Sequence, residues 1–144
     1  MASLMPSLFE YANATMPRLR QKSMLLTSYL ESLLDRRLMG KVHVITPRDP
    51  QQRGAQLSVR ILSPFDGVQL SAAELEHKLA DHGMIVDKRD PDILRVAPKP
   101  MYNSFLDVHR FVSFLEDHLV EEKPPRKGTG GSSRRGGGGK RGGR

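Results

Sequence analysis

The segment covering residues 92–105 constrains the fold most, because it fixes a strand, the end of that strand and the approach to a helix. Its first part alternates, so that Leu94 and Val96 are predicted to face a core, while the residues beside them face the opposite side of a sheet. Pro98 and Pro100 then end the strand, because proline has no backbone N–H and restricts the residue before it. We therefore expect a strand followed by a stiff, extended connector.

Arg95 occupies an outward-facing position in this strand. A guanidinium that leads into a connector stiffened by proline can bind a carboxylate through two parallel N–H···O bonds in a fixed direction. The alternative interpretation is a solvated surface arginine, because most charged residues on strands face water. The spacing of the residues does not decide between the two interpretations.

Two helices are predicted before the first strand. Residues 3–12 have enough apolar spacing for a short helix that starts near Pro6. Thr15 can cap a second helix of roughly 22 residues, with Pro17 in its first turn and Gly40 as its stop. The apolar side of the second helix is predicted to consist of Leu19, Leu26, Tyr29, Leu30 and Leu33.

Four strands are predicted, and they cover residues 42–46, 54–62, 84–86 and 93–97. The second strand alternates clearly, with Leu57, Val59 and Ile61 on one side. This pattern is typical of a sheet that is covered on one face. The turns predicted between the elements cover residues 47–50, 63–67 and 87–91.

Two later helices are predicted to start at serine residues. Ser71 and Glu74 form a capping box, in which each side chain binds the backbone N–H of the other residue, and Leu70 with Leu75 can form a hydrophobic staple. Gly83 suits the left-handed position that ends this helix. The buried stripe of the first of these helices is predicted to be Ala72, Leu75 and Leu79. The last helix begins at Ser104 and is predicted to bury Val108, Phe111, Val112, Leu115 and Leu119.

The order helix, helix, strand, strand, helix, strand, strand, helix indicates an α+β fold. We expect a mostly antiparallel sheet with helices on one face. The chain has 144 residues, which is enough for one domain of ordinary size with a modest core.

The formal charge of +7 is unevenly distributed. Residues 123–144 contain eight Lys or Arg residues and no acid, so residues 1–122 are close to neutral. The tail is rich in Gly, Ser, Arg and Lys and cannot bury enough apolar surface to fold. We therefore predict a folded domain at 1–122 and a disordered basic tail at 123–144.

Other classes of site are not indicated by the sequence. The chain has no cysteine, so disulfide and thiolate chemistry are excluded. The five histidines lack the spacing of metal ligands, and we expect no metal site. No apolar run is long enough to cross a bilayer, so a soluble protein is expected.

Several motifs, in the same order along the chain, resemble the C-terminal part of kynureninase over about residues 2–119. The specific block consists of Leu94-Arg95-Val96-Ala97-Pro98 and Pro100-Met101-Tyr102-Asn103-Ser104-Phe105. Supporting pieces are Lys22-Ser23, Leu25-Leu26-Thr27, Tyr29-Leu30-Glu31, Ile45-Thr46-Pro47, Arg53-Gly54, Gln56-Leu57-Ser58, His82-Gly83 and Asp87-Lys88-Arg89.

The resemblance implies the small domain of a fold-type I pyridoxal-phosphate enzyme. It implies a cytoplasmic homodimer that hydrolyses L-kynurenine or 3-hydroxykynurenine to anthranilate or 3-hydroxyanthranilate and L-alanine, in tryptophan catabolism and NAD biosynthesis. The position matching the family's carboxylate-binding arginine is Arg95, and Tyr102 and Asn103 are candidates to line the same cleft. Tyr102 has an equally good interpretation as a structural plug.

The family's cofactor lysine and phosphate ligands have no counterpart here. We expect no catalytic, cofactor-binding or metal-ligating residue in this chain, and whether it is an enzyme by itself stays open. The first residues resemble the middle of a helix that follows a large domain, so we expect a truncated C-terminal piece of a longer enzyme. Pyridoxal phosphate, the amino-acid substrate, the upstream large domain and a homodimer partner are then its expected partners.

The alternative function is a non-catalytic protein that binds nucleic acid or a protein partner through its Arg/Gly-rich tail. Such tails bind RNA mainly through phosphate contacts, but this one lacks the interleaved aromatic residues that stack on bases. A flexible solubilising extension is therefore favoured over RNA binding for residues 123–144.

Overall fold

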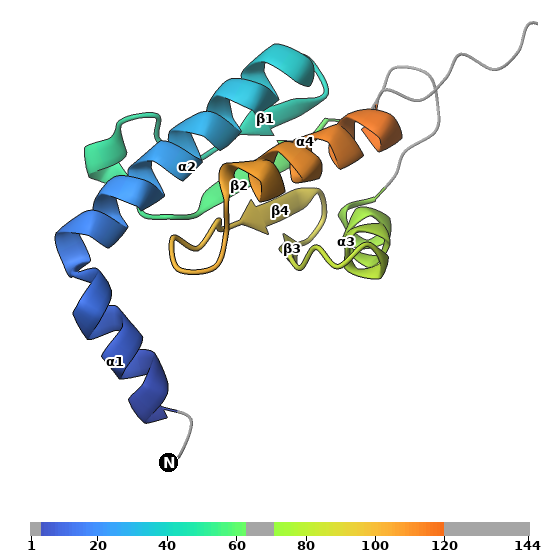
Figure 1. Cartoon of the computed structure of the whole chain (residues 1–144). Helices are drawn as coiled ribbons and strands as arrows, with labels where there is room; N and C mark the ends of the chain where they lie inside the picture. Colours follow the sequence, from blue (N-terminus) through green and yellow to red (C-terminus); the bar gives the residue numbers. More distant parts are fainter. Residues whose placement is uncertain (1–3, 63–70, 120–144) are drawn as a thin grey trace, which may run out of the picture.

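A computed structural model of the chain describes residues 4–62 and 71–119. Four α-helices and four strands follow one another in the order that the sequence predicts (Figure 1). They are α1 (Leu4–Ala14), α2 (Met16–Arg37), β1 (Val42–Val44), β2 (Leu57–Ile61), α3 (Ala72–Asp81), β3 (Asp87–Arg89), β4 (Ile93–Val96) and α4 (Phe105–Leu119), with a short 3₁₀ helix, η1 (Pro50–Gln52), before β2. The predicted loop at 63–67, the staple residue Leu70 and the tail at 123–144 lie outside the described residues.

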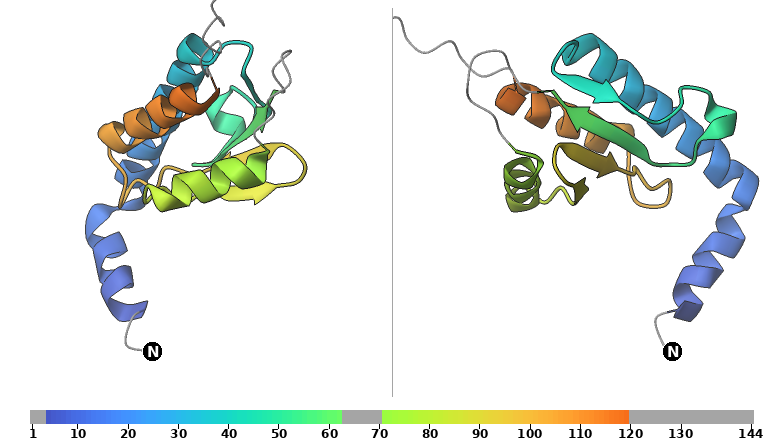
Figure 2. Two further views of the ribbon diagram at one scale, coloured as in Figure 1. Left: turned by 90° about the vertical axis from the view of Figure 1, so that its right-hand side faces the viewer. Right: turned by 180° about the vertical axis from the view of Figure 1, so that it is seen from behind.

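The four strands form one antiparallel sheet in the order β1-β2-β4-β3. The helices α2, α3 and α4 pack on one face of it, since their buried side chains share a single cluster with those of β2 and β4. The two further views show these helices gathered beside the sheet, while α1 extends away from them (Figure 2). The predicted α+β class, with a mostly antiparallel sheet and helices on one face, is confirmed.

The core follows the predicted alternation. Leu57, Val59 and Ile61 of β2 are buried, and so are Leu94 and Val96 of β4. Two helical stripes differ in detail from the prediction. In α2, Leu34 is fully buried and Leu33 only partly, and in α4 Phe114 is buried while Leu119 is half-buried at the end of the helix.

Three helix starts were predicted from their capping residues, and two have the expected hydrogen bonds. The Glu74 backbone N–H donates to the Ser71 hydroxyl at 3.2 Å, and the Ser71 backbone N–H donates to the Glu74 carboxylate at 2.8 Å. Ser104 and Asp107 form the same reciprocal pair before α4. Thr15 stands at the N-cap of α2, but its side chain makes no capping bond and its φ is +54°, so the predicted cap is wrong in its chemistry.

Both capping carboxylates are held in their charged form. The Ser71 backbone N–H, followed by the Ser71 hydroxyl, lowers the pKa of Glu74 below its ordinary value of 4.5. In the same way the Ser104 backbone N–H and hydroxyl lower the pKa of Asp107 below 3.8. These charges also lie at the positive ends of the helix dipoles.

The third strand is not where the sequence predicts it. Residues 84–86 form no strand, and the polar residues Asp87–Arg89, expected to lie in a turn, pair with β4 as β3. The β3–β4 ladder ends at the pair of Asp87 and Arg95, so residues 84–86 lie beyond it. β3 is an edge strand, and an edge strand tolerates polar side chains. The residues that form the strand are therefore decided by the hydrogen-bond register with β4 and not by their apolar character.

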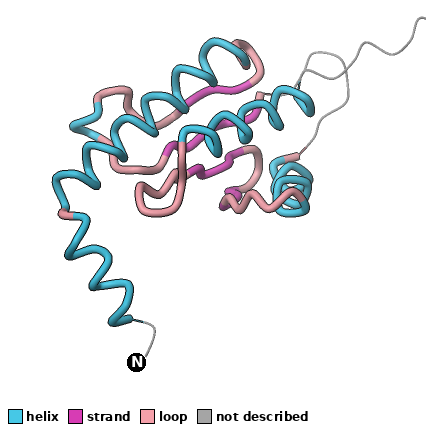
Figure 3. Tube along the Cα trace, viewed as in Figure 1, coloured by secondary structure: helices cyan, strands magenta, loops and turns pink. Residues whose placement is uncertain are grey.

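Helix α2 contacts the C-terminal part of the described chain at several points along its length. It runs for the predicted 22 residues and packs along α4. The Lys22 ammonium donates to the Pro100 carbonyl at 2.7 Å, and the Tyr29 and Phe105 rings meet edge to face with centroids 5.5 Å apart. Arg37, the last residue of α2, forms an ion pair with Glu116 of α4. The tube view shows the loop before α4 returning beside α2 (Figure 3).

Candidate functional site

Arg95 lies on β4, with β2 on one side and β3 on the other. Its neighbours Leu94 and Val96 point into the core, so its own side chain leaves the sheet on the face away from the helices. That side chain is 35% exposed. It is therefore accessible, as the alternation predicts, but it is not a freely solvated arginine.

Two acceptors hold the Arg95 guanidinium from opposite neighbouring strands. Its Nη1 donates to Asp87 Oδ2 of β3 at 3.0 Å, and its Nη2 donates to the Oε1 of Gln56, just before β2, at 2.7 Å. A guanidinium has five N–H donors. Within the described residues three of them stay available, enough for a carboxylate bound through two parallel bonds.

The open face of the sheet is positively charged around this position. It carries Arg60, Arg89 and Arg95, which cross-strand register places on adjacent strands. Asp87 is shared, because Arg89 Nη2 also donates to its Oδ2 at 3.0 Å. Arg60 pairs with Asp92 at 3.4 Å. The charge of Arg60 is thus compensated by Asp92, whereas Arg89 and Arg95 share the single carboxylate of Asp87, which favours binding of a further anion beside them.

Tyr102 and Asn103 are arranged differently from each other. Tyr102 is 73% exposed, so it is not a plug packed into the described part of the chain. Asn103 Oδ1 accepts the Lys99 backbone N–H at 2.7 Å and fixes the turn from Lys99 to Asn103.

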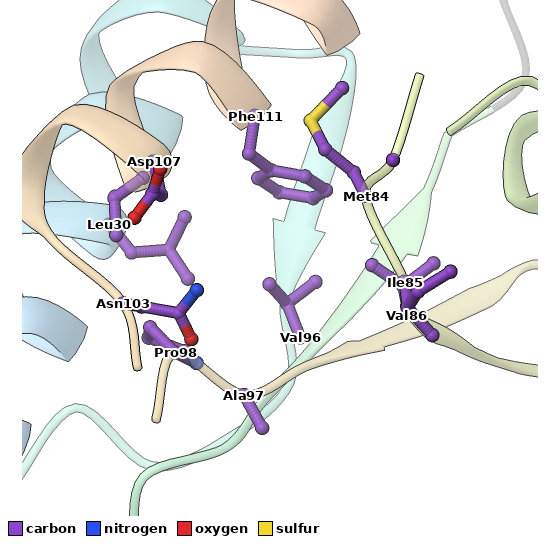
Figure 4. Close-up of a pocket in the computed structure, with 12 residues that line it drawn as sticks. Leu30, Met84, Ile85, Val86, Val96, Ala97, Pro98, Asn103, Asp107 and Phe111 are labelled. Atoms are coloured by element: carbon purple, nitrogen blue, oxygen red, sulfur yellow. The ribbon is translucent and has the colours of Figure 1, made fainter. Parts of the chain in front are cut away.

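Asn103 also lines a pocket of about 160 Å³ at the open end of the β3–β4 hairpin, and most of the residues around this pocket have apolar side chains. The pocket lies between residues 84–86, the end of β4 and helix α4, with Met84 and Phe111 on its walls (Figure 4). Arg95 and Tyr102 are not among its lining residues. The predicted residues are therefore near one another along the chain, but the structure does not bring them into one cavity.

The residues that approach Arg95 were not predicted as site residues. Gln56 and Asp87 belong to the motifs that carry the family resemblance, but neither has a side chain that chemistry alone would single out. Only the strand register shows their role, since it aligns Asp87 with Arg95 and places Gln56 two residues before Ser58, the other partner of Arg95.

A buried ion pair positions the segment that carries Gln56. Arg53, whose side chain is 2% exposed, binds Glu31 of α2 at 2.7 Å. Arg20 of the same helix donates to the Arg53 carbonyl at 3.1 Å. Arg48 adds a bidentate pair with Asp35, and this hydrogen bonding lowers the pKa of Asp35. The loop before β2 is thereby fixed to α2 at several points.

Two other classes of feature are absent from the described part of the chain. Residues 4–62 and 71–119 contain no group of three or more metal-ligating side chains. None of the described helices is both long and apolar enough to span a bilayer. The cluster of Arg95, Asp87 and Gln56 is the arrangement that the geometry best equips for binding.

Comparisons with known proteins match one family over most of the chain. The family model of the kynureninase C-terminal domain matches residues 19–115, a range of this chain that includes Gln56, Asp87 and Arg95. The kynureninase of Myxococcus xanthus (strain DK1622) is 50% identical over 121 residues, which are 84% of this chain and 27% of that protein. The kynureninase of Stenotrophomonas maltophilia (strain K279a) is 44% identical over 116 residues, covering 81% of this chain and 26% of that protein.

A solved structure shares the fold. It is a complex between the cystine C-S lyase C-DES and its reaction product cysteine persulfide, and it matches with a TM-score of 0.54 at 19% identity over 67% of this chain and 23% of that one. The chain spans about a quarter of the length of the curated relatives described above. With the family match covering more than half of its residues, the chain belongs to the kynureninase family and contains that family's C-terminal domain, as the sequence motifs predict.

Proposed function

We propose that this chain is the C-terminal part of a pyridoxal-phosphate-dependent kynureninase. The complete enzyme hydrolyses L-kynurenine, and 3-hydroxykynurenine, to anthranilate or 3-hydroxyanthranilate and L-alanine. Its place is in tryptophan catabolism and NAD biosynthesis, as a cytoplasmic homodimer. The observation that carries the proposal is Arg95, which lies inside the matched family region with donors available on the open face of the sheet.

Arg95 holds the α-carboxylate of the substrate in this proposal. A planar guanidinium that forms two parallel bonds fixes both the position and the direction of a carboxylate. The bonds at the substrate Cα are thereby oriented for cleavage, which lowers the entropic part of the barrier. In this proposal the chain contributes the orientation of the substrate.

Pyridoxal phosphate belongs to the complete enzyme, where it supplies an electron sink when bound. The described residues do not fit the cofactor. Lys22 is bound to the Pro100 carbonyl and Lys88 to Asp90, and no lysine or arginine lines the pocket beside α4. We therefore assign the cofactor lysine, the phosphate ligands and the large domain to the part of the relatives that this chain does not cover.

Tyr102 and Asn103 belong to the proposal as cleft-lining residues with different roles. The exposed Tyr102 ring is available to contact substrate or the large domain. Asn103 shapes the connector through its bond to Lys99. We further propose that the functional domain ends at residue 122, with residues 123–144 as an appended tail.

A hybrid enzyme tests the proposal. This chain replaces the matching C-terminal quarter of the Myxococcus xanthus kynureninase, and hydrolysis of L-kynurenine is followed by the release of anthranilate. We expect the hybrid to be active. We expect Arg95→Ala to lower kcat/KM about 30- to 5,000-fold, which corresponds to a loss of about 2 to 5 kcal/mol of transition-state binding free energy.

Arg60→Ala is the matched control, because Arg60 lies on the same open face of the sheet but is paired with Asp92. It is expected to leave kcat/KM nearly unchanged. An Arg95→Ala hybrid with the kcat/KM of the parent would remove Arg95 from the substrate site. An inactive hybrid that folds would count against the proposed function of the whole chain.

A further inference from the structure

Side chains from three separate segments of the sheet meet at one guanidinium. Gln56 is 39 residues from Arg95, and Asp87 is 8 residues away across the β3–β4 hairpin. We propose that Gln56 and Asp87 are positioning residues, which fix the plane of the Arg95 guanidinium in the orientation that receives the substrate carboxylate. The inference rests on the proposed function of Arg95.

The two residues act from both sides of β4. Asp87 is the direct register partner of Arg95 on β3, and Gln56 extends the neighbouring strand on the other side. One residue holds Nη1 and the other holds Nη2, so rotation of the guanidinium about its Cζ–Nε bond would break both hydrogen bonds. A long arginine side chain loses much rotamer freedom when it binds a ligand. Here that freedom is lost before the substrate arrives, which favours binding through preorganisation.

The chemistry of the two acceptors also sets the charge of the site. Asp87 carries one negative charge, but it is shared between the guanidinium groups of Arg89 and Arg95. Gln56 accepts a hydrogen bond and adds no charge. The cluster of Arg89, Arg95 and Asp87 therefore keeps one unit of positive charge, which matches a single carboxylate. A second acid in place of Gln56 would neutralise it.

The segment bearing Gln56 is held firmly enough for this role. Arg53, three residues earlier, is anchored to Glu31 by a buried ion pair, and Arg20 donates to the Arg53 carbonyl. Asp87 is fixed by the ladder between β3 and β4, and the Lys88 backbone N–H donates to Glu76 of α3 at 3.3 Å. Both acceptors thus sit on supported backbone, although Asp87 itself is 54% exposed.

The first experiment uses the full 144-residue chain labelled with ¹⁵N. The Arg95 side-chain signal is assigned by its loss in Arg95→Lys, and the rate of rotation about Cζ–Nε is measured by NMR exchange. We expect slow rotation at Arg95 and several-fold faster rotation in Gln56→Leu and in Asp87→Asn. Arg60, which is held at Nε by one acid, is the internal reference. Rotation at Arg95 as fast as at Arg60 would overturn the inference.

The second experiment measures kinetics in the hybrid enzyme. Gln56→Leu is expected to raise KM for L-kynurenine by about tenfold or more, the usual effect of losing one hydrogen bond to a charged group. Gln56→Glu keeps an acceptor and is expected to keep Arg95 ordered by NMR, yet to raise KM, because it removes the surplus positive charge. A purely structural role for Gln56 predicts a normal KM in Gln56→Glu.

A hybrid enzyme that carries both Gln56→Leu and Arg95→Ala separates this inference from the proposed function. If Gln56 acts through Arg95, Gln56→Leu causes no further loss of kcat/KM in an Arg95→Ala background. Losses that multiply would show an independent structural effect and overturn the positioning role. An Arg95→Ala hybrid with unchanged kcat/KM would instead contradict the proposed role of Arg95, whatever the NMR rates of the single variants, and an inactive folded hybrid would contradict the proposed function of the chain.

Discussion

The two faces of the four-stranded sheet differ in what they contact and in what they can do. On one face, Leu57, Val59 and Leu94 pack against three helices and are almost completely buried. On the other face, Arg60, Arg89 and Arg95 are half-buried or exposed, and their partners are carboxylates and an amide. Adjacent residues of one strand therefore face different environments, so we expect substitutions on the covered face to affect mainly stability and substitutions on the open face to affect mainly the proposed binding role.

Leu94→Ala should have the largest effect on stability. Leu94 has no exposed surface, so its truncation removes buried methyl groups and leaves a cavity that costs about 2 to 5 kcal/mol. The free energy of unfolding of the full chain, measured by urea denaturation, checks this value. A loss no greater than that of Arg95→Ala would break the distinction between the faces.

Ser71→Ala should have an intermediate effect, because it removes the cap of a helix on the covered face. We expect a loss of about 1 kcal/mol of unfolding free energy. Thr15→Ala is the matched control, since the Thr15 side chain makes no capping bond. Equal losses in the two variants, measured by urea denaturation, would show that the capping bonds of Ser71 do not stabilise the domain.

Arg95→Ala should change stability less than Ser71→Ala does. Its ion pair with Asp87 is partly exposed, and such pairs contribute about 0 to 1 kcal/mol. Thermal and urea unfolding of the full chain measure the change. A loss as large as that of Leu94→Ala would mean that the open face is part of the folding core, and it would complicate any kinetic effect of the same variant.

The smallest expected effect is a dependence of the unfolding free energy on pH in the acid range, which arises from the capping carboxylate of α3. The folded-state pKa of Glu74 is lowered by the Ser71 N–H and hydroxyl, so the stability from this pairing is fully present above its ordinary value of 4.5. It is lost as the pH falls below 4.5 through the folded pKa. Urea unfolding between pH 7 and pH 3 should therefore show a weaker pH dependence in Glu74→Gln than in the parent chain. Parallel pH profiles for the two proteins would contradict the role of this carboxylate.

The sequence predicts the covered face well because period-two alternation and capping chemistry are local signals. The alternation in β2 and β4, the capping box of Ser71 and Glu74 and the cap at Ser104 each depend on residues within a few positions of one another. Residues 84–86 show the limit of such signals. They read as a strand by their apolar character, but pairing with β4 selects the polar residues Asp87–Arg89 instead.

The candidate site is predicted only in part for the same reason. Arg95 could be identified from its motif, and its outward direction from the pattern of its strand. Gln56 and Asp87 could not be identified as its partners, because their contact depends on which strands are neighbours and in which register. A non-local arrangement of this kind leaves no periodic trace in a single sequence.

The pairing of α2 with α4 has a consequence for how the domain folds. The Lys22–Pro100 and Arg37–Glu116 contacts join residues 78 and 79 positions apart. The first helix to contribute to the core, α2, is therefore covered only when α4, the last element, packs against it. During synthesis the apolar stripe of α2 therefore waits for nearly the whole domain before it is covered. Such non-local closure slows folding, and it leaves the nascent chain dependent on α4 for protection from aggregation.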